Sequence, residues 1–407
     1  MIILVLNCGS SSLKYQLLDM KNDEVYDLLA KGLVERIGMD NGHLKHQKTG
    51  AEAFELTTSI PDHTVGIQLV LDALTAKDHG VLENLNDIDA VGHRVVHGGE
   101  SFFSSAYITP EVVEKIKACC ELAPLHNPAN LLGIEAVSKN LPDVPQVAVF
   151  DTAFHQTMPE FNYIYGLPYK YYEQYRIRRY GFHGTSHKYV SQQGAKFAGI
   201  DLEHSKIITC HLGNGSSVTA VENGKCIDTS MGFTPLEGVL MGTRCGCVDP
   251  ELILYIMNKE NLTTKEMSKV MNKESGLYGI SGISSDCRDC GDAATAGDPR
   301  AKIALKKLAH DIIKYIGAYA AQMNGVDLIV FTGGIGENNG RMRSRVCRNL
   351  GYLGVDFDFE ANECRGVERM ISTPSSKVKV AVIPTNEELM IARDTMNIVN
   401  DINDQKF

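Results

Sequence analysis

The chain has 407 residues, of which 43% are hydrophobic and 22% are charged, and its formal net charge is −10. This length allows two or three domains that each bury a core, and the composition is ordinary for a globular protein. The negative charge disfavours nucleic acid and acidic membrane surfaces as partners, and no apolar run reaches the roughly 18 residues of a membrane span.

The first predicted element is a β-hairpin. Residues 2–18 form two apolar strands around a polar tip that runs from Asn7 to Ser12. The same pattern returns at residues 207–221, around a tip that begins at His211. A repeat about half a chain length apart indicates a duplicated domain rather than a solenoid.

Further strands and helices alternate in both halves. Residues 327–331 form an apolar strand that runs into the glycine-rich turn 332–338, and residues 88–93 are its counterpart in the first half. Apolar residues recur at helical spacing between 299 and 325, and a last helix is expected at about 387–398. This alternation predicts an α/β fold with mixed sheets.

The domain boundary is predicted just after Asp151. The first domain then comprises residues 1–151 and is completed by a C-terminal helix at about 387–407. The second comprises residues 152–386.

Eleven cysteines are scattered through the chain, and its first eight residues are too short and uncharged for a secretion signal. We therefore expect reduced thiols and a cytoplasmic protein. Cys245 with Cys247 and Cys287 with Cys290 have spacings that a metal can use. No second pair stands at zinc-finger spacing, which favours small buried or loop residues.

The two hairpin tips are the first sign of chemistry. They present backbone N–H groups and hydroxyls without bulky side chains, and such concavities hold phosphate oxygens. Neither is a P-loop, because each leads into a strand and lacks Gly-Lys-Ser/Thr. Lys14 lies on the same strand face as Ser12. One tip alone is more often an ordinary turn, but two matching tips can hold one polyphosphate.

Basic residues stand among glycines in three loops, at Arg94, His183 and Arg244. A guanidinium in a tight glycine turn suits a carboxylate or a phosphate. A structural salt bridge for each arginine, and a hydrogen-bonded core position for the histidine, are the competing interpretations.

Two acidic residues follow predicted strands. Asp151 comes directly after the apolar residues 147–150, where α/β proteins present functional side chains. Glu387 follows strand 380–383 at a helix start, where it can favour the helix dipole or bind magnesium.

Together these motifs resemble the acetate kinase family, within the superfamily of acetate and sugar kinases, heat-shock proteins and actin. The resemblance covers nearly the whole chain in order. The matching stretches are residues 7–14, 92–99, 124–128, 150–155, 180–187, 211–217, 228–244, 284–289, 333–338 and 384–388.

The resemblance implies two duplicated actin-like, ribonuclease H-like domains with a nucleotide cleft between them, and a homodimer with its interface in the second domain. It implies a reversible, Mg²⁺-dependent, direct in-line transfer between ATP and acetate that gives ADP and acetyl phosphate. Mn²⁺ is a possible substitute for Mg²⁺.

By position in the matching motifs, the resemblance also implies roles for individual residues. Asn7 and Glu387 are implied at the magnesium site, and Arg94 and Arg244 as the clamp for carboxylate and phosphoryl group. His183 is implied as a transition-state donor with His126 in support, and Asp151 as the active-site aspartate. The implied nucleotide contacts are Ser10, Ser12, Lys14, His211, Leu212, Gly213, Asn214, Gly215, Asp286, Cys287, Arg288, Gly333, Gly334, Ile335, Gly336, Glu337 and Asn338.

Val96, Leu125, Phe182 and Pro235 match the small apolar pocket that the family uses for the acetate methyl group. One methylene is worth about 1–3 kcal/mol of discrimination, so propionate is expected to be a poorer substrate that is not excluded.

The reaction needs arginines, a histidine and Mg²⁺, because the transferred phosphoryl group spreads negative charge over its oxygens. Acetate is already ionised and requires no base. We therefore expect Asp151 to orient Mg²⁺ or its waters rather than to abstract a proton.

The chain departs from the family pattern at Cys247, where the family commonly carries aspartate, and at Cys245, where serine is frequent. Three alternatives accompany the acetate kinase interpretation. They are a propionate or butyrate kinase, a pyrophosphate-dependent relative with a damaged adenosine pocket, and a non-enzymatic actin-like nucleotide switch. The intact turn 333–338 disfavours the second, and Arg94, Arg244 and His183 have no purpose in the third.

Overall fold

The computed structural model describes residues 1–124 and 126–404. They fall into two compact units. The first unit runs from Met1 to Phe154 and also contains the described residues from Asn386 onward, and the second runs from His155 to Thr385.

The first unit is built on the predicted hairpin. Strands β1 (Ile2–Cys8) and β2 (Ser12–Met20) pair in antiparallel fashion, with Asn7 opposite Lys14. Four consecutive residues of β1, from Ile3 to Leu6, are buried. Strand β1 is continuously apolar because helices cover both faces of the sheet around it.

Six more strands complete this sheet, in the order β5-β4-β3-β2-β1-β6-β8-β7. Strands β1, β6 and β8 run parallel, and β7 joins the edge in the antiparallel direction. The added strands are β3 (Tyr26–Glu35), β4 (Met39–Lys48), β5 (Phe54–Ile60), β6 (Ala90–Val95), β7 (Ala106–Tyr107) and β8 (Gln146–Phe150).

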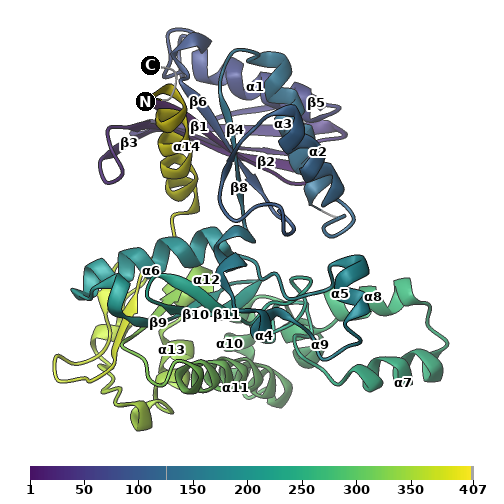
Figure 1. Ribbon diagram of the computed structural model, residues 1–407, viewed down its shortest axis with the longest axis vertical. Helices are drawn as coiled ribbons and strands as arrows, with labels where there is room; N and C mark the ends of the chain where they lie inside the picture. The colour runs from purple at the N-terminus through teal and green to yellow at the C-terminus, as the bar shows by residue number, and fades with distance from the viewer. Residues whose placement is uncertain (125, 405–407) are drawn as a thin grey trace. The chain divides into compact units, whose positions relative to one another are not determined.

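Helices α1 (His63–Thr75) and α3 (Asn127–Asn140) cover one face of this sheet and α14 (Glu387–Asp404) covers the other, with α2 (Pro110–Ala118) beside α3 (Figure 1). The side chain of Asp62 caps α1 by accepting from the Val65 N–H. The apolar pattern predicted the last helix over about 387–398 and the domain assignment extended it to about 407, and the structure describes α14 to Asp404.

The second unit repeats the topology of the first. Its sheet has the order β11-β10-β9-β12-β14-β13, which matches β3-β2-β1-β6-β8-β7 strand for strand, including every parallel and antiparallel pairing. The strands are β9 (Lys206–Leu212), β10 (Ser216–Glu222), β11 (Lys225–Thr229), β12 (Leu328–Thr332), β13 (Arg369–Met370) and β14 (Lys379–Val382). The predicted α/β fold with mixed sheets is confirmed.

Ten α-helices accompany the second sheet in the described chain. They are α4 (Glu160–Tyr163), α5 (Lys170–Tyr175), α6 (Gly184–Ala198), α7 (Pro250–Glu260), α8 (Thr264–Lys273), α9 (Gly276–Ser281), α10 (Cys287–Thr295), α11 (Pro299–Gln322), α12 (Gly333–Asn338) and α13 (Gly340–Cys347). Short 3₁₀ turns are η1 (Leu85–Asp87), η2 (Ala153–Thr157), η3 (Leu202–His204), η4 (Gly351–Leu353) and η5 (Ala361–Glu363).

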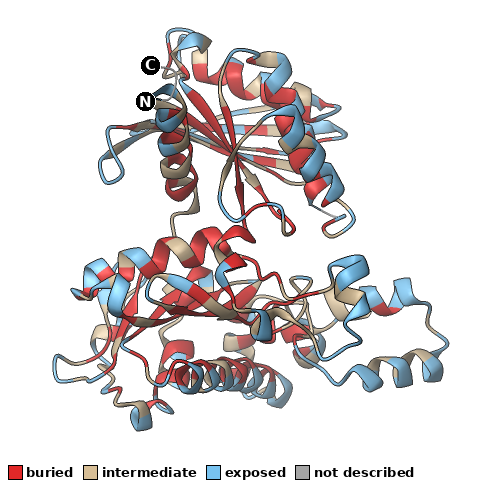
Figure 2. Cartoon of the chain, viewed as in Figure 1, coloured by how far each residue is buried: buried red, intermediate tan, exposed pale blue. Residues whose placement is uncertain are grey.

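Helix α11 supplies much of the second core. Its predicted apolar face, which includes Leu305, Leu308, Ile312 and Ile316, is fully buried against the sheet, whereas α6 packs on the opposite face. Buried residues follow the central strands in both units (Figure 2). In the described part of the chain, no helix has the length and apolar character needed to cross a membrane.

His93 on β6 provides a test of the first core. It is buried, and its Nε2 lies 2.9 Å from Gln146 Oε1. Burial lowers the pKa of His93 from 6.5 to about 4. The pKa of His93 is lower in the folded state than in the unfolded state. The contribution of His93 to folding stability is therefore fully present above the unfolded pKa, and it is lost as the pH falls toward the folded pKa.

We therefore expect His93 to reduce the free energy of unfolding by about 2 kcal/mol between roughly pH 7 and pH 5. Urea unfolding of the wild type and of His93→Gln at both pH values measures this. The variant should lose less stability on acidification, and equal losses in the two proteins would contradict the expectation.

Candidate active site

The first unit holds a bidentate ion pair at the carboxyl ends of its parallel strands. Arg94 lies within β6, rather than in the glycine turn that follows, and Asp151 comes directly after β8. Arg94 Nε donates to Asp151 Oδ1 at 3.0 Å and Arg94 Nη2 to Asp151 Oδ2 at 2.6 Å. Asp151 is 2% exposed, and its charge raises the pKa of Arg94, which remains a fixed cation.

Asn7, at the start of the first hairpin tip, contacts the same guanidinium. Its Oδ1 accepts from Arg94 Nη1 at 3.3 Å. Strands β1 and β6 are parallel neighbours, so their carboxyl ends bring these side chains to one edge of the sheet. Lys14, on β2, is exposed and forms an ion pair with Glu388.

Glu387 begins helix α14, and in the described chain its carboxylate has no hydrogen bond or ion pair. It is only partly exposed, and desolvation raises its pKa to about 7. Nearby Arg94 opposes this rise, whereas Asp151 and Glu388 add to it. A desolvated carboxylate with acidic neighbours favours the approach of a cation.

The oxygen atoms of Asn7 and Glu387 fit a magnesium ion, which prefers hard oxygen ligands. Among the described residues, no three His, Cys, Asp or Glu side chains converge as a metal site of their own. Magnesium does not need such a group, since it commonly takes one or two protein ligands together with waters and substrate phosphates.

Two buried asparagines on α3 fix the segment that follows Arg94. Asn130 Oδ1 accepts from the Val96 N–H, and its Nδ2 donates to the Cys8 carbonyl at 2.8 Å. Asn127 makes a matching pair of bonds with the backbone N–H and C=O of His97. Helix α3 thereby joins the end of β1 to the predicted pocket residue Val96. His126 is exposed just before α3, and Leu125 lies outside the described residues.

In the second unit, the hairpin tip between β9 and β10 packs closely against two predicted catalytic residues. A Cβ atom at Gly215 would lie 3.4 Å from Arg244 Nη2 and 3.5 Å from His183 Cε1. The tip is tightened by a hydrogen bond from Gly213 N to Ser216 Oγ at 3.1 Å. The first tip is closed in a related way, by Gly9 N donating to the Ser12 carbonyl.

Arg244 differs from Arg94 in its surroundings. Its Nη1 donates to the Pro235 carbonyl at 2.7 Å, and in the described chain no carboxylate lies within ion-pair distance of it. Burial lowers its pKa, although a guanidinium remains charged at neutral pH. A partly buried cation without a counter-ion is well suited to an anionic ligand.

His183 immediately precedes helix α6 in the left-handed backbone region, at φ 56°. Such a conformation is uncommon for residues other than glycine and is often found at functional sites. Its Nδ1 lies 2.8 Å from Ser217 Oγ, and its ring stacks on that of His211 with centroids 4.2 Å apart. The buried Phe182, from the predicted pocket, is the residue before it.

The glycine-rich segment 333–338 forms helix α12 directly after β12. Gly333 has φ 74°, and a Cβ there would lie 2.8 Å from the Leu212 carbonyl oxygen, so no larger residue fits. This close approach joins the segment to the hairpin tip. The remaining predicted contacts in it, Gly334, Ile335, Gly336 and Asn338, lie in the same short helix.

Glu337 is also a predicted nucleotide contact, and its carboxylate accepts hydrogen bonds from the protein backbone. Its Oε1 accepts from the backbone N–H of Gly333 at 2.9 Å and of Thr385 at 3.1 Å. The fully buried Arg343 donates to the carbonyls of Gly336 and Glu337 and so fixes the end of the segment.

Asp286 caps helix α10 by accepting from Arg288 N, and it also pairs with the exposed Arg288 side chain at 2.6 Å. Between them, the buried Cys287 accepts from Asn339 Nδ2 at 3.4 Å, next to the 333–338 segment. Asn214 O accepts from Gly242 N at 3.0 Å, which brings the hairpin tip against the loop of Arg244. Four predicted parts of the site are therefore neighbours within this unit.

Comparison with known proteins agrees with this geometry. The family model described as "Acetokinase family" matches residues 2–393. The chain belongs to the acetokinase family. It is 60% identical over 399 residues to the acetate kinase of Halothermothrix orenii, covering 98% of this chain and 100% of that protein. It is 58% identical over 400 residues to the acetate kinase of Clostridioides difficile, with the same coverage.

Solved structures of acetokinases agree as well. The acetate kinase of Porphyromonas gingivalis superposes with a TM-score of 0.94 at 50% identity, covering 98% of this chain and 99% of that one. A propionate kinase from Francisella tularensis superposes with a TM-score of 0.88 at 43% identity, with coverage of 97% and 99%.

Two cysteines, Cys245 and Cys247, were expected to depart from the family pattern near Arg244. Cys247 is exposed, and its Sγ lies 3.3 Å from Tyr315 Oη. Cys245 is half-buried and contacts the Gly246 carbonyl. The backbone of Cys247 donates to Gly238, so this residue helps to close the loop that carries Arg244.

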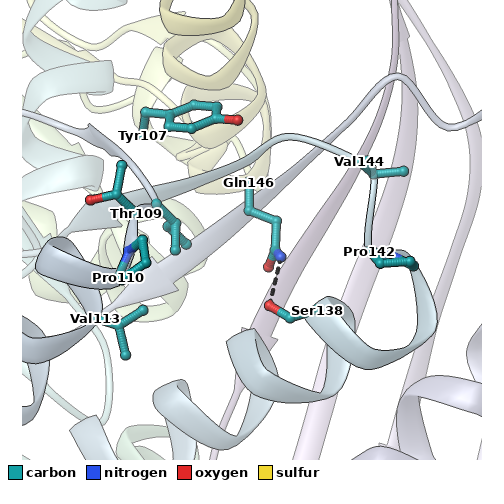
Figure 3. Close-up of a pocket in the computed structure, with 9 residues that line it drawn as sticks. Tyr107, Thr109, Pro110, Val113, Ser138, Pro142, Val144 and Gln146 are labelled. Carbon is teal, nitrogen blue, oxygen red and sulfur yellow. Dashed lines mark hydrogen bonds between the residues drawn. The ribbon is translucent and has the colours of Figure 1, made fainter.

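One cavity in the first unit has a lining that contains none of the predicted site residues. It is lined by uncharged residues around α2, α3 and the start of β8, including Tyr107, Val113, Ser138 and Gln146 (Figure 3). Asp151 follows the opposite end of β8. Because the cavity offers no cation to a phosphate or carboxylate, it does not compete with the arginine clusters as the site.

Asn130 gives a test of how the site is held. Asn130→Ala would leave the Val96 N–H and the Cys8 carbonyl without their buried partner, and the expected loss of stability is about 2–4 kcal/mol. Asn140→Ala, on the same helix, removes only a bond to the Ala136 carbonyl and should cost about 1 kcal/mol or less. Urea unfolding measures both, and equal small losses would contradict the expected role.

Proposed function

We propose that this chain is an acetate kinase that reversibly transfers a phosphoryl group between ATP and acetate, giving ADP and acetyl phosphate. The observation that carries the proposal is the pair of arginines at the two repeated hairpins. Asp151 accepts two hydrogen bonds from Arg94, whereas Arg244 lies with His183 against Gly215 and has no counter-ion among the described residues. The curated relatives at 58–60% identity are named acetate kinases, which favours acetate over a longer acid.

The nucleotide is assigned to the glycine-rich surface of the second unit. Residues 211–215 and 333–338 pack together there with 286–288 beside them, and backbone N–H groups near glycines are suited to phosphate and ribose. Ser10, Ser12 and Lys14 are assigned to phosphate contacts from the first hairpin. The carboxylate of Glu337 supports this surface from within, since its Oε1 is engaged by Gly333 and Thr385.

Arg94, Arg244 and His183 are assigned to the transferring phosphoryl group and the acetate carboxylate, and His126 to support. Fixed donors stabilise the charge that spreads over the phosphoryl oxygens as the bond to the leaving oxygen breaks. Val96, Phe182 and Pro235, with Leu125, are assigned to the methyl group of acetate.

Asn7 and Glu387 are assigned to Mg²⁺. When bound, the ion neutralises phosphate oxygens and orients the polyphosphate. Asp151 is expected from sequence to orient Mg²⁺ or its waters, and both of its oxygens also accept hydrogen bonds from Arg94. We assign to it the orientation of Arg94 toward the carboxylate, and acetate, already ionised, needs no base.

We further propose a cytoplasmic homodimer. The eleven cysteines are all free thiols, as expected in a reducing compartment. Helix α7 buries none of its residues although it exposes Leu252, Leu254 and Tyr255, and a second copy of the chain would cover such a face. Sedimentation velocity distinguishes a dimer from a monomer.

Trapping of the acyl phosphate with hydroxylamine tests the proposed reaction. With ATP, Mg²⁺ and acids from formate to butyrate, the signal should be greatest with acetate and smaller with propionate. Arg94→Ala and Arg244→Ala should each lower kcat/KM by about 10²-fold or more, because each removes charge stabilisation of the transition state.

Arg348→Ala, which removes an exposed arginine after α13, is the matched control and should keep full activity. A greater signal with propionate or butyrate would keep the mechanism and change the acid. No signal with any acid, in a protein that still binds ATP, would rule out the kinase and favour a nucleotide switch.

Asp151→Asn tests the orienting role of Asp151. An amide can accept from only one of the two Arg94 nitrogens, and its own NH₂ group would face the other. We expect kcat/KM for acetate to fall by about tenfold or more, and Arg94→Ala combined with Asp151→Asn to be no worse than Arg94→Ala alone. Full additivity of the two losses would show that Asp151 acts independently of Arg94.

A further inference from the structure

A line of buried side chains runs from the interior of the second unit to His183. Thr209 Oγ1, on β9, lies 2.7 Å from His187 Nδ1. His187 Nε2, on α6, lies 2.7 Å from Ser217 Oγ, and the same oxygen, on β10, lies 2.8 Å from His183 Nδ1. Thr209, His187 and Ser217 are each 0% exposed, so bulk water does not reach these bonds.

The direction of these hydrogen bonds follows from counting protons, starting at Thr209. In the described part of the chain, His187 Nδ1 is the one side-chain partner of Thr209 Oγ1. A buried hydroxyl must place its proton on an acceptor. Thr209 therefore donates to His187 Nδ1, and the reverse arrangement would leave the hydroxyl proton without an acceptor.

His187 carries this direction onward. Burial keeps its pKa well below the ordinary value, with the charges of His155 and His211 acting in the same sense, so the ring is neutral and has a single N–H. Since Nδ1 accepts from Thr209, the proton is on Nε2, which donates to Ser217 Oγ.

Ser217 completes the line. Within the described chain its hydroxyl has two side-chain partners, His187 and His183. Because it accepts from His187, its own proton is directed to His183 Nδ1. A neutral His183 then carries its ring proton on the other nitrogen, Nε2.

We propose that Thr209, His187 and Ser217 are positioning residues that hold His183 as the Nε2–H tautomer. This rests on the proposed function in one respect, namely that His183 donates from Nε2 to the phosphoryl group. With the opposite tautomer, a nitrogen lone pair would face anionic oxygens, and the donor needed in the transition state would be missing.

Thr209→Val and Thr219→Val form a matched pair for the test. The two threonines are cross-strand partners on β9 and β10, both are 0% exposed, and valine keeps their shape. Thr219 bonds Thr229 at 2.8 Å and has no part in the line. Both variants lose one buried hydroxyl, but only Thr209→Val removes the group that sets the direction.

The readout is the ¹⁵N NMR shift of the His183 ring nitrogens in protein labelled at histidine, with His183→Gln for assignment. We expect a single Nε2–H tautomer in the wild type and in Thr219→Val. Thr209→Val and Ser217→Ala should show the averaged shifts of a ring that exchanges between tautomers. An Nδ1–H tautomer in the wild type, or a locked tautomer in Ser217→Ala, would overturn the proposal.

Kinetics separate this proposal from the proposed function. Ser217→Ala should lower kcat by about tenfold, as for other groups that orient a catalytic residue, with KM for ATP and acetate unchanged, and Thr219→Val should match the wild type. If Ser217→Ala altered the tautomer shifts but left kcat unchanged, the tautomer of His183 would have no effect on catalysis. A wild type without kinase activity but with the predicted shifts would contradict the function and keep the tautomer assignment.

Discussion

The whole arrangement depends on one constraint of sheet geometry, that parallel neighbouring strands end at the same edge. In the first unit β1, β6 and β8 run parallel, and in the second β9, β12 and β14 do. A hairpin tip follows the first strand of each trio, so in each unit a glycine- and serine-rich turn meets the side chains presented by the next two strands. This constraint brings Arg94 and Asp151 together in one unit, and it brings Gly333 to the hairpin tip in the other.

The two units share one topology but hold their arginines in opposite electrostatic surroundings. In the first unit the cation of Arg94 is fixed by a buried carboxylate, at the cost of neutralising part of its charge. In the second unit the cation of Arg244 is held by a backbone carbonyl and keeps its full charge. One arginine is thus suited to precise orientation, and the other to attracting an anion, and a transfer between two anions requires both properties.

Local patterns in the sequence were sufficient for the fold. The apolar runs around Asn7 and His211 predicted both hairpins, and the helical spacing from Leu305 to Ile316 predicted α11, because strand and helix periodicity is a short-range property. The motifs also identified the family. The apolar pattern was followed only to about residue 398, although Val399 is buried and α14 continues to Asp404.

The sequence alone could not predict which side chains, distant in the chain, form hydrogen bonds or ion pairs with each other. The pairing of Asp151 with Arg94 was not predicted, because it depends on the register of β6 against β8. Asn130 was not singled out, and His187 and Ser217 appeared only as the last residues of matching stretches, without roles of their own. Their importance comes from which buried groups they satisfy, and a single sequence gives no sign of that. The nearest available signal was that Asn130 stands two residues after the motif that ends at Pro128 and that Ser217 closes the motif 211–217.

Helix α14 gives the first unit an unusual dependence on the end of the chain. It packs on β1, β6 and β8, but it is made after the whole of the second unit. During synthesis the second unit can therefore finish its core while the first still exposes one apolar face of its sheet. The first unit, whose sheet is synthesised before α14, therefore keeps that apolar face uncovered until α14 packs on it.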